Sequence, residues 1–389
     1  MPSWLPLLLG FLTAIGPIST DMYLPAFPEI EAGFGTGLGS AQLTLATWFV
    51  GLAVGQVAQG TLSDRFGRRG PLIVGTLIYT FASIGCALAP SMGWLAAFRC
   101  LAAFGGSASS VIPRAVVRDM ATGLDAARLM SRLILVMGAA PILAPSLGGL
   151  LLGMAGWRSI FWVMAAYGAV SCLLVWKLLP DTLPVEKRLR LGPVAMLQSY
   201  VRVVSEPIFL THAMLGSAVM FGMFAYISGA PAIYIEHFGM TPGQFAIVFG
   251  CSAGGFIGGA QLNPRLVWRF GAGRVLTIAS FTLLLSALLL ALFGWTGWGG
   301  MWGIFLPVIL MLSASSLIMP NSAVGALARH GQRAGTASAL LGTMQFTVAA
   351  IGSMVVGIVA DSTPTPIAAV ILFGAVMTVV LNQLRRRFG

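Results

Sequence analysis

The stretch Pro17-Ile18-Ser19-Thr20-Asp21-Met22-Tyr23-Leu24-Pro25 places a carboxylate inside the first long apolar segment of a 389-residue chain. In a lipid bilayer a charged side chain is costly unless it faces water or a partner, so an intramembrane acid is a candidate functional residue. Whether Asp21 has such a role depends first on whether the chain crosses a membrane.

The composition indicates that it does. Hydrophobic residues make up 57% of the chain and charged residues 8%, whereas a soluble domain is about 25% charged. Apolar runs long enough to cross about 30 Å of hydrocarbon recur from end to end. Because the runs are continuous rather than alternating, they predict an all-α polytopic membrane protein and exclude a β-barrel.

About twelve spans are predicted from apolar length and from breaks at charge, Pro and Gly. They cover residues 4–27, 41–61, 71–90, 93–115, 130–153, 157–179, 207–231, 243–263, 274–293, 301–325, 334–358 and 365–384. The longest polar stretch between them divides the set into two. We therefore expect an N-terminal six-helix bundle (1–179), a cytoplasmic linker with one surface helix (180–206) and a C-terminal six-helix bundle (207–389).

The loops predict the orientation. Connections that follow even-numbered spans carry arginines, beginning with Arg65, Arg68 and Arg69, whereas the first outer connection carries Glu29 and Glu31. The positive-inside rule then places both termini in the cytoplasm. The net charge of +11 is explained by these loops, so no nucleic-acid partner is expected. The N-terminus has no basic segment before the first span, and a cleaved signal peptide is not expected.

Several motifs resemble one transporter family. Gly60…Ser63-Asp64-Arg65-Phe66-Gly67-Arg68-Arg69 is similar to the signature loop of the major facilitator superfamily, and Pro141-Ile142-Leu143-Ala144-Pro145-Ser146-Leu147-Gly148-Gly149 to the fifth-helix antiporter motif of its drug:proton branch. The segments 21–26, 228–236 and 334–342 resemble the Bcr/CflA subfamily, whose members export bicyclomycin, sulfonamide and chloramphenicol-type drugs. One departure is Trp48, where that subfamily is expected to have Tyr.

This resemblance implies a major-facilitator fold and a proton-coupled multidrug exporter of the bacterial inner membrane, working by alternating access. The expected partners are small amphipathic drug-like molecules, protons and the lipid bilayer. The proton gradient would supply the energy, with no cofactor and no metal. We expect a monomer.

Asp21 and Arg99 are the predicted proton-coupling residues. Each lies about six residues from the outer end of its span, so at about 1.5 Å per residue their depths match and the two charges are expected to pair or compete across a cavity. The resemblance also assigns proton coupling to an Arg at this place. Two simpler alternatives remain open: Asp21 caps a Pro break at the interface, and Arg99 is a static hydrogen-bonding strut.

Two further groups are predicted from the motifs. The fifth-span residues Gly138, Pro141, Pro145, Gly148 and Gly149 are expected to bend and pack against a helix of the other half, or simply to pack closely. The loop residues are expected to form a cytoplasmic latch that holds the two halves together, or only to determine topology. This group comprises Gly60, Asp64, Arg65, Gly67, Arg68, Arg69 and Arg118, with Arg114 and Asp119 nearby.

A substrate-binding wall is predicted from aromatic, Met and amide side chains, because such surfaces adapt to varied ligands. Each of these residues is otherwise explained as core or lipid-facing filler. The candidates are Met22, Tyr23, Gln42, Trp48, Phe49, Phe221, Phe224, Tyr226, Tyr234, Asn321, Met344, Gln345 and Phe346.

Two other functions stay open at this point. One is proton-coupled transport of a physiological solute such as a sugar, amino acid or small peptide. The other is a non-transporting membrane sensor or scaffold. Enzyme function has no support, because the chain contains no phosphate-binding loop, no nucleophile elbow and no zinc-protease motif.

Overall fold

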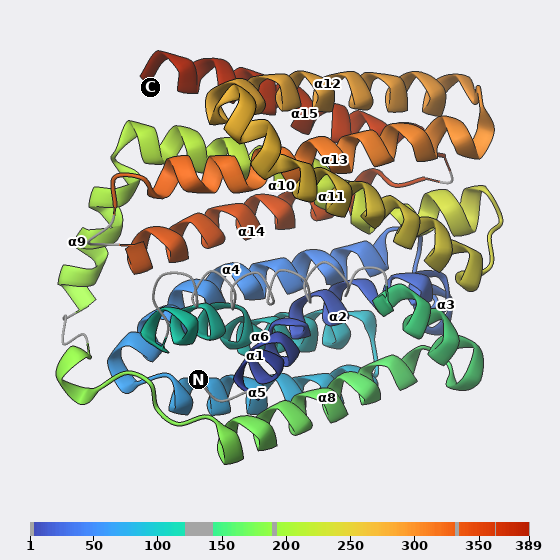
Figure 1. Cartoon of the computed structure of the whole chain (residues 1–389). Helices are drawn as coiled ribbons and strands as arrows, with labels where there is room; N and C mark the ends of the chain where they lie inside the picture. Colours follow the sequence, from blue (N-terminus) through green and yellow to red (C-terminus); the bar gives the residue numbers. More distant parts are fainter. Residues whose placement is uncertain (1–3, 121–142, 189–192, 331–333, 362, 389) are drawn as a thin grey trace.

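The computed structural model describes residues 4–120, 143–188, 193–330, 334–361 and 363–388, and every regular element in these ranges is a helix (Figure 1). Before the linker these are α1 (Leu5–Thr13), α2 (Ile15–Asp21), η1 (Leu24–Ala26), α3 (Phe27–Phe34), α4 (Ser40–Phe66), α5 (Arg69–Ala87), α6 (Met92–Met120) and α8 (Trp157–Leu178). The linker holds η2 (Val185–Lys187) and α9 (Pro193–Val204). After it come α10 (Pro207–Pro231), η3 (Ala232–His237), α11 (Pro242–Phe270), α12 (Ala272–Thr296), α13 (Gly300–Leu327), α14 (Ala334–Val359) and α15 (Thr365–Phe388).

Eleven helices among the described residues are long and apolar enough to cross a membrane. The remaining predicted span, 130–153, falls partly on residues 121–142, which lie outside the described ranges. Its second part is the shorter apolar helix Leu143–Ala155. The surface helix expected in the linker is present as α9.

The first span is not one continuous helix. It runs from Leu5 to Phe34 as four helical pieces, α1, α2, η1 and α3, and so extends beyond the predicted end at residue 27. Pro25 and Pro28 explain the later breaks, because proline lacks an N–H and fits best in the first turn of a helix. Each of these prolines lies in the first turn of η1 or α3. Asp21 consequently ends α2 at a break in the span.

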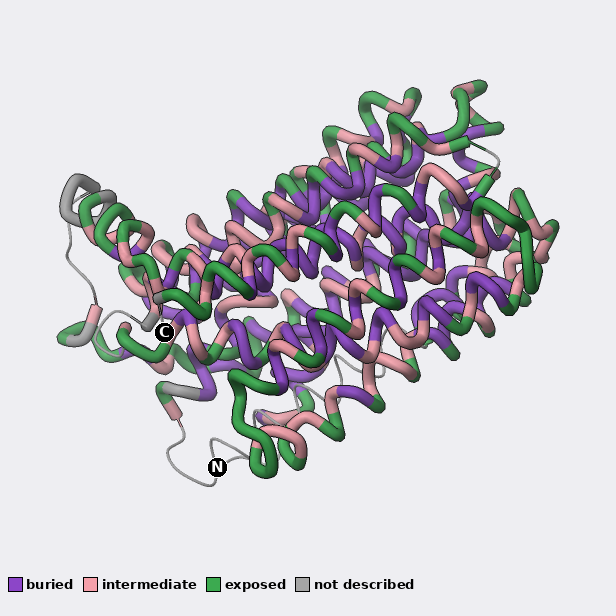
Figure 2. Tube along the Cα trace, turned by 90° about the horizontal axis from the view of Figure 1, so that it is seen from above, coloured by how far each residue is buried: buried purple, intermediate pink, exposed green. Residues whose placement is uncertain are grey.

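The helices gather in two groups. In Figure 1 the elements up to α8 lie together below, and α10 to α15 lie together above. Both termini lie at the same end of the molecule, where α9 also lies (Figure 1). Figure 2 shows buried positions along the inner faces of the helices and exposed positions mainly along the outer faces, as expected where lipid covers the outside.

The two groups meet along α4 and α14. Near one end, the Ser353 hydroxyl donates to the Gln42 carbonyl oxygen at 3.2 Å. Further along, the Thr343 hydroxyl donates to the Ala53 carbonyl oxygen at 2.9 Å. At the extreme end, a Cβ on Gly357 would lie 2.9 Å from the Gly39 carbonyl oxygen, so the two backbones touch. We call this contact the α4–α14 seam. Small residues allow such close approach between membrane helices.

Inside the first group, glycine also sets the spacing of α4 and α6. A Cβ on Gly55 would lie 2.8 Å from the Ser107 Cβ and 3.0 Å from the Phe104 carbonyl oxygen. A Cβ on Gly254 of α11, by contrast, would meet no atom within 4 Å. Position 55 therefore leaves no room for a side chain, whereas position 254 does.

We therefore expect Gly55→Leu to force α4 and α6 apart, at a cost of about 1–3 kcal/mol typical of overpacking. Thermal unfolding of the purified protein in detergent should show a fall of several degrees in the melting temperature. Gly254→Leu is the matched control and should melt within about one degree of the wild type. Equal losses for both variants would contradict this account of the helix contact.

Candidate functional site

Asp21 is buried, with 5% of its side chain exposed. It is the last residue of α2, and the backbone beyond it leads into η1, which contacts α10 and α11 of the second group. Asp21 therefore lies inside the protein at the junction of the two groups, as a proton-coupling residue requires, and does not face lipid or bulk water.

Arg99 of α6 lies beside the same segment. Its Nη1 donates to the Ser19 carbonyl oxygen at 2.7 Å. The guanidinium carbon lies 4.3 Å from the centre of the Tyr23 ring and 4.6 Å from that of Trp48, with Phe161 further away at 6.0 Å. Only 1% of the side chain is exposed, and its Nε and Nη2 have no hydrogen-bond partner. The aromatic faces, together with one carbonyl, therefore hold this buried cation.

The expected charge pair between Asp21 and Arg99 is not formed. The structure contains no ion pair between these two described residues; the guanidinium instead bonds to the backbone two residues earlier, at Ser19. The prediction rested on equal depth in the membrane, which fixes the position of a residue along its helix axis but not the direction of its side chain. Tyr23 and Trp48 occupy the guanidinium faces, so aromatic rings and a backbone carbonyl hold the Arg99 cation, and the Asp21 carboxylate does not.

Ser19 is itself held in place. Its hydroxyl lies 2.7 Å from the hydroxyl of Tyr79 on α5. We call the rings of Tyr23, Trp48 and Phe161 around Arg99 the cage. The Tyr23 hydroxyl donates to the Ala41 carbonyl oxygen at 3.0 Å and also contacts the Thr44 hydroxyl. The residues around Asp21 are thus fixed by α4, α5 and α6 together.

The described part of the fifth span approaches this site. A Cβ on Gly148 would overlap the carbonyl oxygen of Met22, the residue after Asp21. On the adjacent residue, a Cβ on Gly149 would lie 3.3 Å from the carbonyl oxygen of Pro242 in the other group. Pro145 is buried, and Gly138 and Pro141 lie outside the described residues. This helix therefore packs against the Asp21 segment as well as against the second half.

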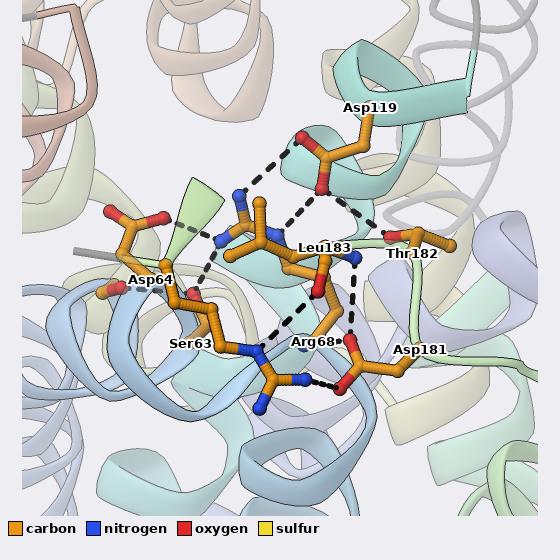
Figure 3. Close-up of polar contacts among 9 residues, drawn as sticks. Ser63, Asp64, Arg68, Asp119, Asp181, Thr182 and Leu183 are labelled. Atoms are coloured by element: carbon orange, nitrogen blue, oxygen red, sulfur yellow. Dashed lines mark hydrogen bonds and ion pairs between the residues drawn. The ribbon is translucent and has the colours of Figure 1, made fainter. Parts of the chain in front are cut away.

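Arg68 is the centre of the charged cluster at the end where the termini lie. Its Nη1 lies 2.5 Å from Asp64 Oδ1, and its Nε lies 2.7 Å from Asp119 Oδ2 (Figure 3). Burial alone would lower the pKa of Arg68, but the hydrogen bonds and charges of the two carboxylates outweigh it and raise the pKa above its ordinary value. The cation therefore stays charged and ties α4 to α6.

Asp181, from the start of the linker, completes the cluster. Its Oδ1 accepts the Arg68 backbone N–H at 2.8 Å, and its Oδ2 pairs with Arg188 Nη2 at 2.8 Å (Figure 3). Gly67 has a φ of 92°, and a Cβ there would overlap the Asp181 carboxylate. This loop therefore requires glycine. The prediction missed Asp181, because the linker carried no pattern that indicated docking.

The ion pairs of Arg68 join helices of the first half and do not cross to the second half, contrary to the predicted latch. In this cluster Asp64 is the residue that comes close to the second half. Its Oδ2 lies 3.8 Å from the Cβ position of Gly335 in the first turn of α14. A carboxylate is stabilised near a helix N-terminus. Gly60 also faces α14, with its Cβ position 3.9 Å from the Ala339 Cβ.

The other latch residues have separate contacts. Arg69 donates to the Trp176 carbonyl oxygen of α8, and the guanidinium carbon of Arg65 lies 5.5 Å from the centre of the Phe66 ring. The side chain of Arg118 lies outside the described residues.

Most of the predicted substrate wall belongs to one continuous apolar core, in which seven of its residues are buried and against which Phe224 and Phe346 pack; the seven are Met22, Tyr23, Trp48, Phe49, Phe221, Tyr226 and Tyr234. Tyr23 and Trp48 surround Arg99, and Met22 packs against Gly148. Phe49, Phe224 and Phe346 meet at the junction of the groups, with ring centres 4.3 Å and 6.3 Å from Phe49, and Gln42 lies on the α4–α14 seam. The remaining contacts lie in the second group: Phe221 with Phe373, Tyr226 with Ser252, Tyr234 with Phe245, Asn321 with Asn263, and Gln345 with Gly216. These local contacts lie within an apolar core that runs through both groups of helices.

A model of the Major Facilitator Superfamily matches residues 9–353. The bicyclomycin resistance protein homolog of Haemophilus influenzae is 30% identical over 98% of this chain and 95% of its own length. The chloramphenicol resistance protein of Pseudomonas aeruginosa is 29% identical over 98% of this chain and 91% of its own.

Among solved structures, the xylose transporter XylE from E. coli, in a partially occluded inward-open conformation, matches with a TM-score of 0.78. The match covers 100% of this chain and 98% of XylE, at 14% sequence identity. At that identity the likeness concerns the fold alone. With the family match, it confirms the fold class. The family match and the two resistance-protein relatives confirm the family resemblance predicted from the sequence motifs.

The Arg68 cluster gives a stability prediction. Arg68→Ala would leave Asp119, whose side chain is 14% exposed, without its cation, and breaking a buried pair costs about 3–5 kcal/mol. The melting temperature in detergent should therefore fall much further for Arg68→Ala than for Arg265→Ala, which changes an exposed arginine near the end of α11 in the second half. If the two variants melt alike, the Arg68 network does not stabilise the first half.

Proposed function

Because the chain belongs to the major facilitator superfamily, a family of transporters rather than enzymes, we propose that it exports amphipathic drug-like molecules in exchange for protons. The relatives named for bicyclomycin and chloramphenicol resistance support this assignment. The observation that carries it is Asp21, a buried acid at a helix break between the two halves, beside a buried arginine with which it forms no pair.

In the proposed cycle the two six-helix halves, 1–179 and 207–389, rock about the α4–α14 seam. With the protein open to the cytoplasm, Asp21 carries a proton and a drug enters from the cytoplasm or inner leaflet. The drug and the proton exclude one another, so drug binding releases the proton. After rocking, the drug leaves and Asp21 takes a proton from the outer side.

The driving force in this proposal is the proton gradient, with no cofactor. Moving one charge through 100 mV supplies about 2.3 kcal/mol, to which a pH difference adds. Arg99 is the second coupling residue. Held by Tyr23, Trp48 and the Ser19 carbonyl, its guanidinium is kept from Asp21; released from them, it would stabilise the Asp21 carboxylate.

The proposed location is the bacterial inner membrane, with the chain working as a monomer. Both termini would face the cytoplasm. Their position at one end of the molecule, together with the Arg68 cluster, supports this orientation under the positive-inside rule (Figure 1).

Asp21→Asn tests the proposal directly. The amide is close in shape to the acid but cannot exchange a proton, so active efflux of chloramphenicol from proteoliposomes with an imposed pH gradient should be abolished. Exchange of labelled for unlabelled drug without a gradient should persist, because it requires only drug-bound rocking.

Asp361→Asn, which changes an exposed acid beyond α14, is the matched control and should retain active efflux. A panel that also includes a sulfonamide, a cationic dye, sugars and amino acids identifies the substrate class. Normal gradient-driven efflux by Asp21→Asn would exclude Asp21 as the proton carrier.

A further inference from the structure

Glu31 of α3 is a buried acid that the proposed cycle does not use. Only 5% of its side chain is exposed. Its Oε1 accepts the Ala41 backbone N–H at 3.0 Å and the Ser40 hydroxyl at 3.5 Å. With the Gln42 amide turned so that its nitrogen faces acceptors, that nitrogen lies 3.2 Å from Glu31 Oε1.

These donors belong to the first turn of α4. The N-cap residue of α4 is Gly39, which has no side chain to cap the helix. Glu31 therefore supplies the missing cap from the preceding helix, where a negative charge is favoured by the helix dipole. The N-terminal turn of this 27-residue helix is held by one carboxylate.

The capped turn is connected to the Arg99 site through Ala41. The N–H of Ala41 bonds to Glu31, and its carbonyl oxygen accepts the Tyr23 hydroxyl at 3.0 Å. The Tyr23 ring in turn covers one face of the Arg99 guanidinium at 4.3 Å. A shift of the first turn of α4 therefore displaces a ring that holds the Arg99 guanidinium.

The same turn forms one end of the α4–α14 seam. Gly39 touches Gly357 through the backbone, and the Gln42 carbonyl oxygen accepts the Ser353 hydroxyl. Glu31 thus lies where movement between the halves is transmitted to α4.

We infer that Glu31 is a positioning residue for proton coupling: through Ala41 and Tyr23 it links the end of the α4–α14 seam to the aromatic rings that hold the Arg99 guanidinium. This inference rests on the proposed exchange of drug for protons. Loss of the Glu31 cap lets Tyr23 move off Arg99, and the freed guanidinium then stabilises the Asp21 carboxylate. The other titratable groups that interact with Arg99 are Tyr79 and Cys86, both on α5.

The test compares Glu31→Gln with Glu31→Asp and Glu29→Gln. Glutamine keeps one acceptor but turns a donor toward the helix N–H groups, whereas aspartate keeps the charge. Glu29 is the matched control, because it lies on the same helix and accepts the Trp157 backbone N–H at 3.3 Å at the start of α8, away from the seam.

The first measurement is chloramphenicol-induced proton release from purified protein as a function of pH. Glu31→Gln should move the midpoint of release to lower pH by about one unit, a tenfold change in proton affinity. Glu31→Asp should restore most of that shift, and Glu29→Gln should leave the midpoint unchanged. If Glu31→Gln only lowers the melting temperature without moving the midpoint, or moves it upward, Glu31 is merely a helix cap.

A second measurement does not depend on transport. Cys86 is buried and lies near Arg99, so its rate of alkylation reports opening of the cage in a protein whose other three cysteines are serine. Glu31→Gln should raise that rate about tenfold over Glu29→Gln; equal rates would overturn the link. If the alkylation rate rises in Glu31→Gln but not in Glu29→Gln, and the wild type releases no protons when drug is added, then the connection from Glu31 to the cage stands and the proposed function fails.

A double-mutant cycle identifies the route. Tyr23→Phe removes the hydroxyl that bonds to Ala41, so its effect on Cys86 alkylation should resemble that of Glu31→Gln. In the double variant the two effects should be far from additive, because both act through one connection. Full additivity would contradict transmission through Ala41 and Tyr23.

Discussion

The site depends on a buried guanidinium that has no carboxylate partner. Taking such an ion out of water costs several kcal/mol, and Arg99 recovers part of this cost from the faces of Tyr23 and Trp48 and from the Ser19 carbonyl. Cation–π contacts supply about 2 kcal/mol or more when desolvated. Because two of the guanidinium nitrogens remain without a hydrogen-bond partner, a modest change in the cage is enough to favour another arrangement. That property suits a group that has to respond to protonation next to it.

The α4–α14 seam explains how movement of the two halves is transmitted to the aromatic rings around Arg99. Trp48 and Ala41 both belong to α4, the helix that meets α14 across the junction of the halves. At the end of α4 near Arg68, a carboxylate faces the first turn of α14; at the other end, glycine backbones touch. The Asp64 carboxylate and the backbones of Gly39 and Gly357 are small groups, so these two contacts can separate without leaving a large cavity. The helix that carries one wall of the Arg99 site is therefore also the helix on which the halves move.

Much of this architecture could be predicted from the sequence, because it depends on apolar length, arginine-rich loops and proline. Those features predicted the spans, the linker helix α9 and the burial of Asp21. They did not predict the direction of the Arg99 side chain, since depth in the membrane does not determine rotation about a helix axis. Asp181 and Glu31 were also missed, because a carboxylate that caps a neighbouring loop or helix has the same sequence pattern as a charge in an exposed connection. The contacts that individual substrate-wall side chains make likewise depend on how helices rotate against one another.

The central claim is that the Asp21 carboxyl loses its proton when drug binds. Infrared difference spectroscopy on purified protein tests it most directly, by recording the carbonyl stretch of protonated carboxyl groups with and without chloramphenicol. The account predicts that drug removes one such band, that the band shifts in heavy water, and that it is missing in Asp21→Asn but present in Asp361→Asn. Drug binding without any change in that band, or the same loss of the band in Asp21→Asn, would contradict it.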